Sequence, residues 1–173
     1  TKAIVNGFDH ERIDLIKIQK KCNIYFSKNT KIKIIYVGAL NNTKNQIALL
    51  EVLEKYRMDA ELIFLGDGVN KKNLMDYSKK IPDSIKISFK GIVSREKAIE
   101  HMLEADVCIS LSKGEGLPIA VLEAMYAGCF MILSTIRPHK EVSPPLERCF
   151  FVDISSMEEK INSLKYVTNN IKS

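Results

Sequence analysis

The sequence ADVCISLSKGEGLPIAVLEAMYAGC spans residues 105–129 and decides the fold of this chain. It opens with the apolar run 107–109, which is typical of a strand buried in a parallel sheet. A loop with two glycines follows, and residues 117–127 then predict a helix that ends at Gly128. Pro118 falls in the first turn, where a missing N–H costs nothing. Such a strand, loop and helix N-terminus bind anions, because free N–H groups and the helix dipole face the ligand.

Two carboxylates in this arrangement can bind hydroxyl groups. Glu115 lies in the loop, and Glu123 lies eight residues later within the predicted helix. Carboxylates repel an anion but accept hydrogen bonds from hydroxyl groups, and one carboxylate can serve both hydroxyls of a diol. A phosphate with sugar hydroxyls on both sides has the shape of a nucleotide sugar. In the alternative interpretation, Glu123 is a solvent-exposed residue on a helix face, and Glu115 is a loop charge favoured by the dipole.

Residues 115–125, EGLPIAVLEAM, resemble the E-x7-E signature of retaining GT-B glycosyltransferases, in particular glycosyltransferase family 4 (group 1). The following Ala127 and Gly128 fit the same pattern. The resemblance implies a C-terminal, donor-binding domain that binds a UDP- or GDP-linked nucleotide sugar and holds no metal or other cofactor. It also implies that Glu115 is the catalytic residue, in contact with the transferred sugar, and that Glu123 binds the ribose hydroxyls.

Two further segments resemble the same family. Residues 38–44, GALNNTK, correspond to the family pattern G-R-L-x-x-x-K, whose Arg and Lys neutralise the donor diphosphate. Lys44 matches this pattern, whereas Ala39 replaces the Arg. Residues 90–94 resemble a turn whose backbone meets the nucleotide base. The resemblance therefore assigns donor contacts to Gly38, Lys44, Gly91, Val93, Gly116, Leu117, Pro118 and Glu123.

The helix dipole gives a reason to single out Lys44 that does not depend on the family resemblance. A cation at a helix N-terminus is disfavoured, so a lysine in that place makes better sense if it faces an anionic ligand. The plainer interpretation is a surface lysine. Residues 134–142 are expected to form a loop that corresponds to the family's glycine-rich G-x-x-E segment, although the glycines are absent. Arg137, His139 or Lys140 could there supply the positive charge that Ala39 does not.

The rest of the chain predicts an alternation of strands and helices. Further strands are expected at 33–37, 60–65, 84–89, 130–133 and 150–152. Further helices are expected at 44–56, 70–80, 94–104 and 157–167. This order predicts an α/β fold with a Rossmann-like, doubly wound parallel sheet. Since ligands bind at the carboxyl ends of such strands, Gly38, Gly91 and Glu115 should lie at one edge.

The length and composition of the chain narrow the range of its possible functions. The 173 residues suffice for one domain with a sizeable core. The net charge of +5 suits an anionic ligand or a membrane surface, but the lysines are scattered and no aromatic-plus-basic stripe indicates nucleic acid. The four cysteines lack C-x-x-C spacing, which favours buried free thiols in a reducing compartment over metal ligands or disulfides. No signal peptide and no run of about 20 apolar residues is recognised.

The chain has no initiator Met and is expected to be a piece of a longer protein. Residues 4–9, IVNGFD, resemble the NG-x-D entry to the second domain, so 1–30 are assigned to an entry segment from a missing N-terminal domain. Residues 31–173 are assigned to the nucleotide-sugar-binding domain. The piece alone is expected to be inactive, because a glycan or lipid-linked acceptor would bind through the missing domain. The full enzyme is expected in the cytoplasm, with peripheral membrane contact as an option.

Three other functions stay open. One is a flavodoxin-like nucleotide-binding module or a signalling receiver, although residues 36–38 lack the acidic cluster that a receiver needs. Another is a different GT-B class, such as a sugar-nucleotide epimerase or a glycogen-type synthase. The third is a degenerate, non-catalytic partner subunit that has lost the Arg.

Overall fold

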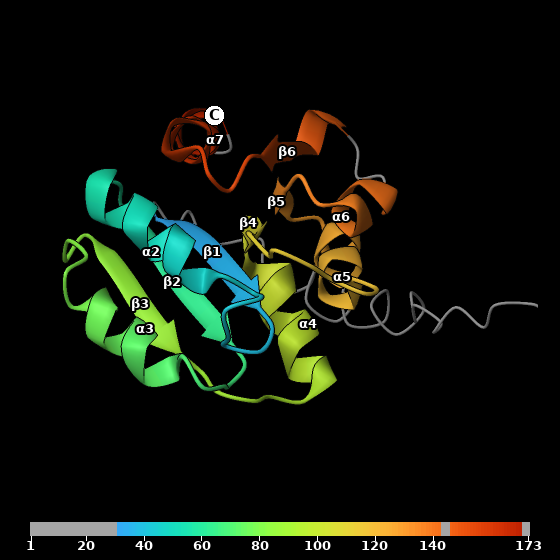
Figure 1. The fold of residues 1–173 in the computed structure, drawn as a ribbon, viewed down its shortest axis with the longest axis horizontal. Helices are drawn as coiled ribbons and strands as arrows, with labels where there is room; N and C mark the ends of the chain where they lie inside the picture. The colour runs from blue at the N-terminus through green and yellow to red at the C-terminus, as the bar shows by residue number, and fades with distance from the viewer. Residues whose placement is uncertain (1–30, 143–145, 171–173) are drawn as a thin grey trace, which may run out of the picture.

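The computed structural model describes residues 31–142 and 146–170, which form a six-stranded parallel sheet with helices on both faces (Figure 1). The strands are β1 (Ile32–Val37), β2 (Ala60–Leu65), β3 (Ile85–Phe89), β4 (Val107–Ser110), β5 (Phe130–Ser134) and β6 (Cys149–Val152). The α-helices are α2 (Gln46–Lys55), α3 (Lys71–Ser78), α4 (Arg95–Glu104), α5 (Ile119–Ala127), α6 (Arg137–Glu141) and α7 (Met157–Asn170). A 3-10 turn, η1 (Leu146–Arg148), precedes β6. The expected entry segment, 1–30, and Cys22 lie outside the described residues.

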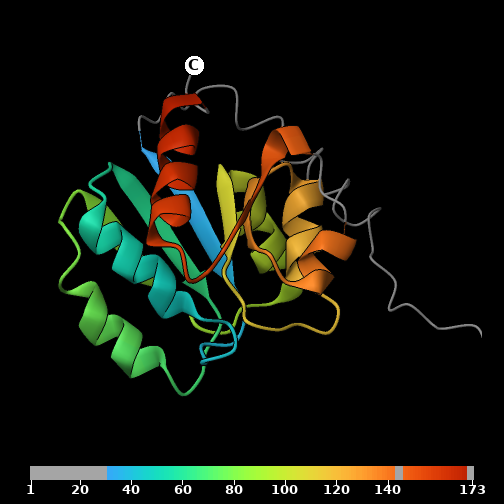
Figure 2. The same ribbon diagram turned by 45° about the horizontal axis from the view of Figure 1, so that its top comes forward.

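The strand order is β3-β2-β1-β4-β5-β6, which is the doubly wound topology that the sequence predicts. The chain first builds the sheet from β1 to β3, then crosses back through α4 and builds it in the other direction from β4 to β6. Helices α2, α3 and α7 therefore cover one face, and α4 and α5 cover the other (Figure 2). The reversal lies between β1 and β4, where this fold class binds its ligands.

The central strands are apolar on both faces because both faces are covered. Ile34 and Tyr36 pack with the core under α2 and α7, whereas Ile35 between them packs with the core under α4 and α5. Every residue of β4 and β5 is buried. The edge strand β3 is different, because Lys86 is exposed and Ser88 is partly exposed on a part of the sheet that no helix covers fully.

Several boundaries differ by one to three residues from the sequence prediction, and three differences have a clear cause. The helix expected from residue 117 begins at Ile119, because Pro118 is the N-cap and not part of the first turn. The expected loop 134–142 contains α6, whose Pro138 sits in the first turn and has a φ suited to helix entry. The last helix continues past the expected end at 167 to Asn170, and its final turns are held by ring contacts and by a hydrogen bond between Tyr56 and Thr168.

The cysteines that the structure describes are buried and unpaired. They are Cys108, Cys129 and Cys149. Burial raises the pKa of Cys129 and of Cys149 to about 12, so both thiols stay protonated at neutral pH. Over residues 31–142 and 146–170, no helix combines the length and the apolar character needed to cross a membrane.

Candidate functional site

The loops that follow the strands meet at the carboxyl edge of the sheet. Gly38 follows β1, Gly91 lies two residues after β3, and Glu115 lies five residues after β4. Because all six strands are parallel, their carboxyl ends share this edge, and the structure brings the three residues there as the strand order requires. Backbone hydrogen bonds join the loops, with the Gly66 N–H 2.8 Å from the Gly91 carbonyl oxygen and the Gly38 N–H 2.9 Å from that of Leu65.

Lys44 and Glu115 form the central ion pair of this edge. The Lys44 Nζ lies 2.5 Å from Glu115 Oε1 and 2.6 Å from Oε2. Ser112 Oγ donates a third hydrogen bond to Oε1 at 2.7 Å. Only 9% of the Glu115 side chain and 25% of the Lys44 side chain are exposed, so water screens this pair less than an ion pair on the open surface. The site thus holds a cation and a carboxylate in fixed positions.

The loop before α2 is shaped to aim Lys44 at this point. Asn41 Oδ1 accepts a hydrogen bond from the Lys44 N–H at 2.9 Å. Asn45 has a left-handed φ of 56°, which asparagine tolerates better than most residues, and its amide donates to the Leu111 carbonyl at 3.1 Å. A Cβ on Gly38 would lie 3.3 Å from the Lys44 Cε, so the glycine leaves room for the lysine stem.

Tyr36 ties the two site loops together. Its hydroxyl donates to the Lys44 carbonyl oxygen and accepts the Leu111 N–H at 2.8 Å. The side chain is fully buried, and burial raises the pKa of the phenol far above its ordinary value, so it stays a neutral donor. Sequence reasoning missed this role. The one signal was a tyrosine inside a run of β-branched residues, since a buried hydroxyl needs a partner.

Glu123 is buried and paired. It is 6% exposed, and its Oε1 lies 2.6 Å from the Nε of Arg95 at the start of α4. The alternative interpretation of Glu123 as a solvent-exposed residue is therefore wrong. Sequence reasoning did not single out Arg95, because its partner lies 28 residues away and only the packing of α4 on α5 brings the two together. Each site carboxylate thus has its own cation.

The N-terminus of α5 faces open space. A Cβ added to Gly114 or Gly116 would meet no atom within 4 Å. Gly116 and Leu117 are exposed, and within the described part of the chain their N–H groups form no hydrogen bond. Pro118 is buried and caps α5 without a side-chain hydrogen bond. This end of α5 can therefore offer N–H groups and a positive dipole end to an anion beside Lys44.

The hypothesis that His139 supplies positive charge is wrong. His139 is fully buried in α6, with Nδ1 3.0 Å from Ser134 Oγ and Nε2 3.4 Å from Ser110 Oγ. Burial lowers the pKa of the imidazole, so it is neutral at physiological pH. The Ser134 hydroxyl itself donates to the Ser112 carbonyl at 2.6 Å, and it therefore accepts from His139 Nδ1–H. His139 supports the loop that carries Glu115.

The two other basic residues of this segment are at the surface. The Arg137 Nε lies 2.6 Å from Glu141 Oε1, and both side chains are well exposed. Lys140 is exposed as well. Compensation for Ala39 by Arg137 or Lys140 stays a prediction.

The buried imidazole predicts a pH dependence of stability. The pKa of His139 is lowered from 6.5 on folding, so the unfolded chain binds the proton first as the pH falls. Glu115 opposes this shift, and Lys44 adds to it. Stability should be full above about pH 6.5 and should fall below it. Urea unfolding at about pH 7.5 and about pH 5.5 should show a larger loss for the wild-type chain than for His139→Gln.

A matched control for this experiment is His101→Gln on α4, where the imidazole is only partly buried. Its stability should depend on pH as that of the wild-type chain does. If His139→Gln lost as much stability as the wild-type chain between the two pH values, the assignment to His139 would be incorrect.

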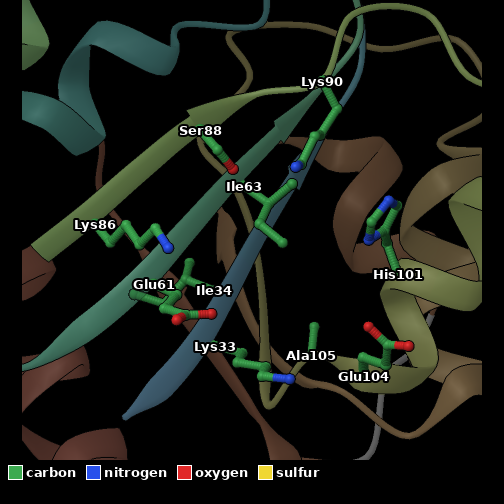
Figure 3. A pocket seen from close by; sticks show the side chains of 10 residues that line it. All are labelled: Lys33, Ile34, Glu61, Ile63, Lys86, Ser88, Lys90, His101, Glu104 and Ala105. Carbon is green, nitrogen blue, oxygen red and sulfur yellow. The ribbon is translucent and has the colours of Figure 1, made fainter.

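A separate hollow of about 190 Å³ lies on the sheet face beside α4 (Figure 3). Lys33, Glu61 and Lys86 line it from the second residue of β1, β2 and β3, and His101 and Glu104 line it from α4. Its lining mixes both signs of charge and, apart from Lys90 at the start of the turn 90–94, includes none of the residues that the sequence assigns to a ligand. Within the described residues, no group of three or more His, Cys, Asp or Glu is placed to hold a metal ion. The candidate site is therefore the carboxyl edge.

Comparison with known proteins identifies the family of this chain. The chain matches the family model of glycosyl transferases group 1 over residues 17–172. It belongs to this family. A flavodoxin-like receiver is therefore excluded, whereas the membership alone leaves the donor, the acceptor and the linkage open.

Two similar curated proteins are named for the biosynthesis of capsular polysaccharide and of O-antigen. The capsular polysaccharide biosynthesis glycosyltransferase CapH of Staphylococcus aureus is 29% identical over 151 residues, which cover 82% of this chain and 38% of the relative. The O-antigen biosynthesis glycosyltransferase WclY of Escherichia coli is 25% identical over 169 residues, which cover 96% of this chain and 46% of the relative. The chain therefore spans less than half of the length of these two relatives.

Solved structures show the same fold. Anabaena HepE in complex with UDP and glucose is 19% identical with a TM-score of 0.70, and the match covers 100% of this chain and 50% of HepE. The apo form of the lipopolysaccharide outer core galactosyltransferase WaaB is 20% identical with a TM-score of 0.73, and the match covers 86% of this chain and 43% of WaaB. These matches confirm the predicted α/β fold as one half of a GT-B glycosyltransferase.

Proposed function

We propose that this chain is the donor-binding domain of a retaining glycosyltransferase, which moves a sugar from a UDP- or GDP-linked nucleotide sugar to a glycan or lipid-linked acceptor. The observation that carries the proposal is the pair of buried or nearly buried carboxylates, Glu115 and Glu123, around the N-terminus of α5 at the carboxyl edge. Membership of the group 1 family supports it, as do similar proteins that were solved with UDP.

The anionic part of the donor would lie between Lys44 and α5. Lys44 would neutralise the diphosphate, and the N–H groups of Gly116 and Leu117 would donate to its oxygens. Pro118 ends this segment and fixes where α5 begins. Gly38 would let the diphosphate approach the backbone after β1. Negative charge that develops as the diphosphate leaves would be stabilised by these fixed donors, so none of the proposed steps requires a protein-bound metal.

The carboxylates would bind the two sugars on either side of the diphosphate. Glu115 would contact the transferred sugar as the catalytic residue, and Glu123 would accept hydrogen bonds from the ribose hydroxyls. The base would meet the main chain at Gly91 and Val93, since the Val93 side chain packs against the core under α4 and α5. Arg95 would hold the Glu123 carboxylate in place toward the ribose.

The proposal includes a second domain. Residues 1–30 would be the entry from an N-terminal domain, and residues 31–173 the donor-binding domain. The acceptor would bind to the N-terminal domain, so this chain alone would not catalyse transfer. In the full protein we place the reaction in the cytoplasm, with any peripheral membrane contact made through the N-terminal domain.

Calorimetric titration of the chain with UDP, GDP and ADP tests this assignment. One nucleoside diphosphate should bind, and both Lys44→Ala and Glu123→Ala should weaken its binding by about tenfold or more, as expected for the loss of a charge-assisted hydrogen bond. The matched controls are Lys165→Ala on the exposed face of α7 and Asp83→Ala in the exposed turn before β3, and neither should change the affinity. Binding that Glu123→Ala leaves unchanged would move the site elsewhere.

A further inference from the structure

The Lys44–Glu115 pair joins two residues that the proposed function assigns to different parts of the donor. The cation assigned to the diphosphate is held by both oxygens of the carboxylate assigned to the sugar. We propose that Lys44 is exchanged between Glu115 and the diphosphate, and that Glu115 thereby lowers the affinity of the site for a nucleoside diphosphate that carries no sugar. This inference rests on the proposed function and concerns the selectivity of the same site.

The geometry makes Glu115 compete with the diphosphate for the Lys44 ammonium. A lysine ammonium has three N–H donors at the end of a flexible stem, and two short contacts to Glu115 already engage it. A diphosphate at the α5 N-terminus needs the same ammonium. If Lys44 turned toward it, the charge of Glu115 would remain close by, in a position that is 9% exposed and only partly screened by water.

The arrangement around Glu115 shows what can replace Lys44. Ser112 is fully buried, and its hydroxyl holds Glu115 Oε1 at 2.7 Å, so the carboxylate keeps its position when the ammonium leaves. Sugar hydroxyls can supply the hydrogen bonds that Lys44 gives up. A nucleoside diphosphate brings no such hydroxyls, and it would leave a nearly buried carboxylate without its cation, which is costly. The pair therefore favours a complete nucleotide sugar over the spent nucleoside diphosphate.

Glu123 differs from Glu115 in its partner, although both belong to the same site. It pairs with Arg95 and not with Lys44. The ribose that it would bind is present in both the nucleotide sugar and the nucleoside diphosphate, so Glu123 should help both ligands. Removing the charge of Glu115 and removing the charge of Glu123 should therefore have opposite effects on nucleoside diphosphate binding.

A double-mutant cycle tests the exchange. The 173-residue chain is titrated with UDP, GDP and ADP, and the nucleoside diphosphate that binds is compared across variants. Glu115→Gln should tighten its binding by at least about fivefold, which is a usual size for such coupling. In the Lys44→Ala background the gain should be clearly smaller, because no ammonium remains to be released and only the repulsion between Glu115 and the diphosphate is relieved. Glu123→Gln should weaken binding.

The outcomes separate the two proposals. If Glu115→Gln binds no tighter than the wild-type chain, or gains as much in the Lys44→Ala background, the exchange is overturned while the donor site stands. Glu115→Ala serves as a second variant and should give the same direction. If the wild-type chain binds none of the three nucleoside diphosphates, the proposed function falls and this inference falls with it.

Discussion

Replacement of Gly66 by alanine should destabilise the protein by about 3–5 kcal/mol, which is the range of severe steric changes in a packed backbone. A Cβ at this position would lie 2.1 Å from the Gly38 carbonyl oxygen, and no flexible side chain is involved that could move aside. The φ of 132° adds strain, because side chains other than glycine avoid it. The hydrogen bond from Gly66 N–H to Gly91 and the one from Gly38 N–H to Leu65 hold both loops in place.

Chemical unfolding with circular dichroism measures this loss. Gly114→Ala is the matched control, because its Cβ would enter open space and its φ is not in the left-handed range. Its stability should stay within about 0.5 kcal/mol of the wild-type value. A Gly66→Ala chain as stable as Gly114→Ala would show that the loops after β1 and β2 do not approach each other this closely.

Tyr36→Phe should cost about 2–4 kcal/mol of folding free energy although it removes one oxygen atom. The hydroxyl is the partner of the Lys44 carbonyl and of the Leu111 N–H, and the ring is fully buried. Without it, both backbone groups lose a hydrogen bond at once, and water has little access to replace it. The change should also loosen the loop that aims Lys44 and so weaken nucleoside diphosphate binding, with the binding-site side chains themselves intact.

Urea unfolding and the nucleotide titration together check this prediction. Tyr166→Phe is the control, since its half-exposed ring packs against Phe150 and Phe130 through its faces and edges, which phenylalanine retains. It should change stability by less than about 0.5 kcal/mol and leave binding unchanged. Equal effects of Tyr36→Phe and Tyr166→Phe would contradict the bridging role of the Tyr36 hydroxyl.

Local sequence patterns predicted most helices and strands well, because each of them packs at least one side against a hydrophobic core. The strand expected at 60–65 has those bounds, and Ser94 caps α4 by accepting the Lys97 N–H as a helix start of that type does. The helix α6 escaped prediction because five residues with a proline give too short a pattern to distinguish from a loop. The doubly wound parallel sheet was predicted from the alternation of elements, since right-handed crossovers leave few topologies open. The strand order itself comes from the structure.

The amino-acid sequence by itself determined the α/β alternation, the glycine loop before α5 and the presence of two carboxylates eight residues apart. The tertiary structure decided their partners. Lys44 and Glu115 are 71 residues apart and meet because β1 and β4 are neighbours in the sheet. The same neighbourhood makes the Tyr36 hydroxyl a bridge. The pairing of β4 with β5 places Ser110 and Ser134 beside the buried His139. These contacts depend on how strands and helices pack across the sheet, and local propensity contains no information about that packing.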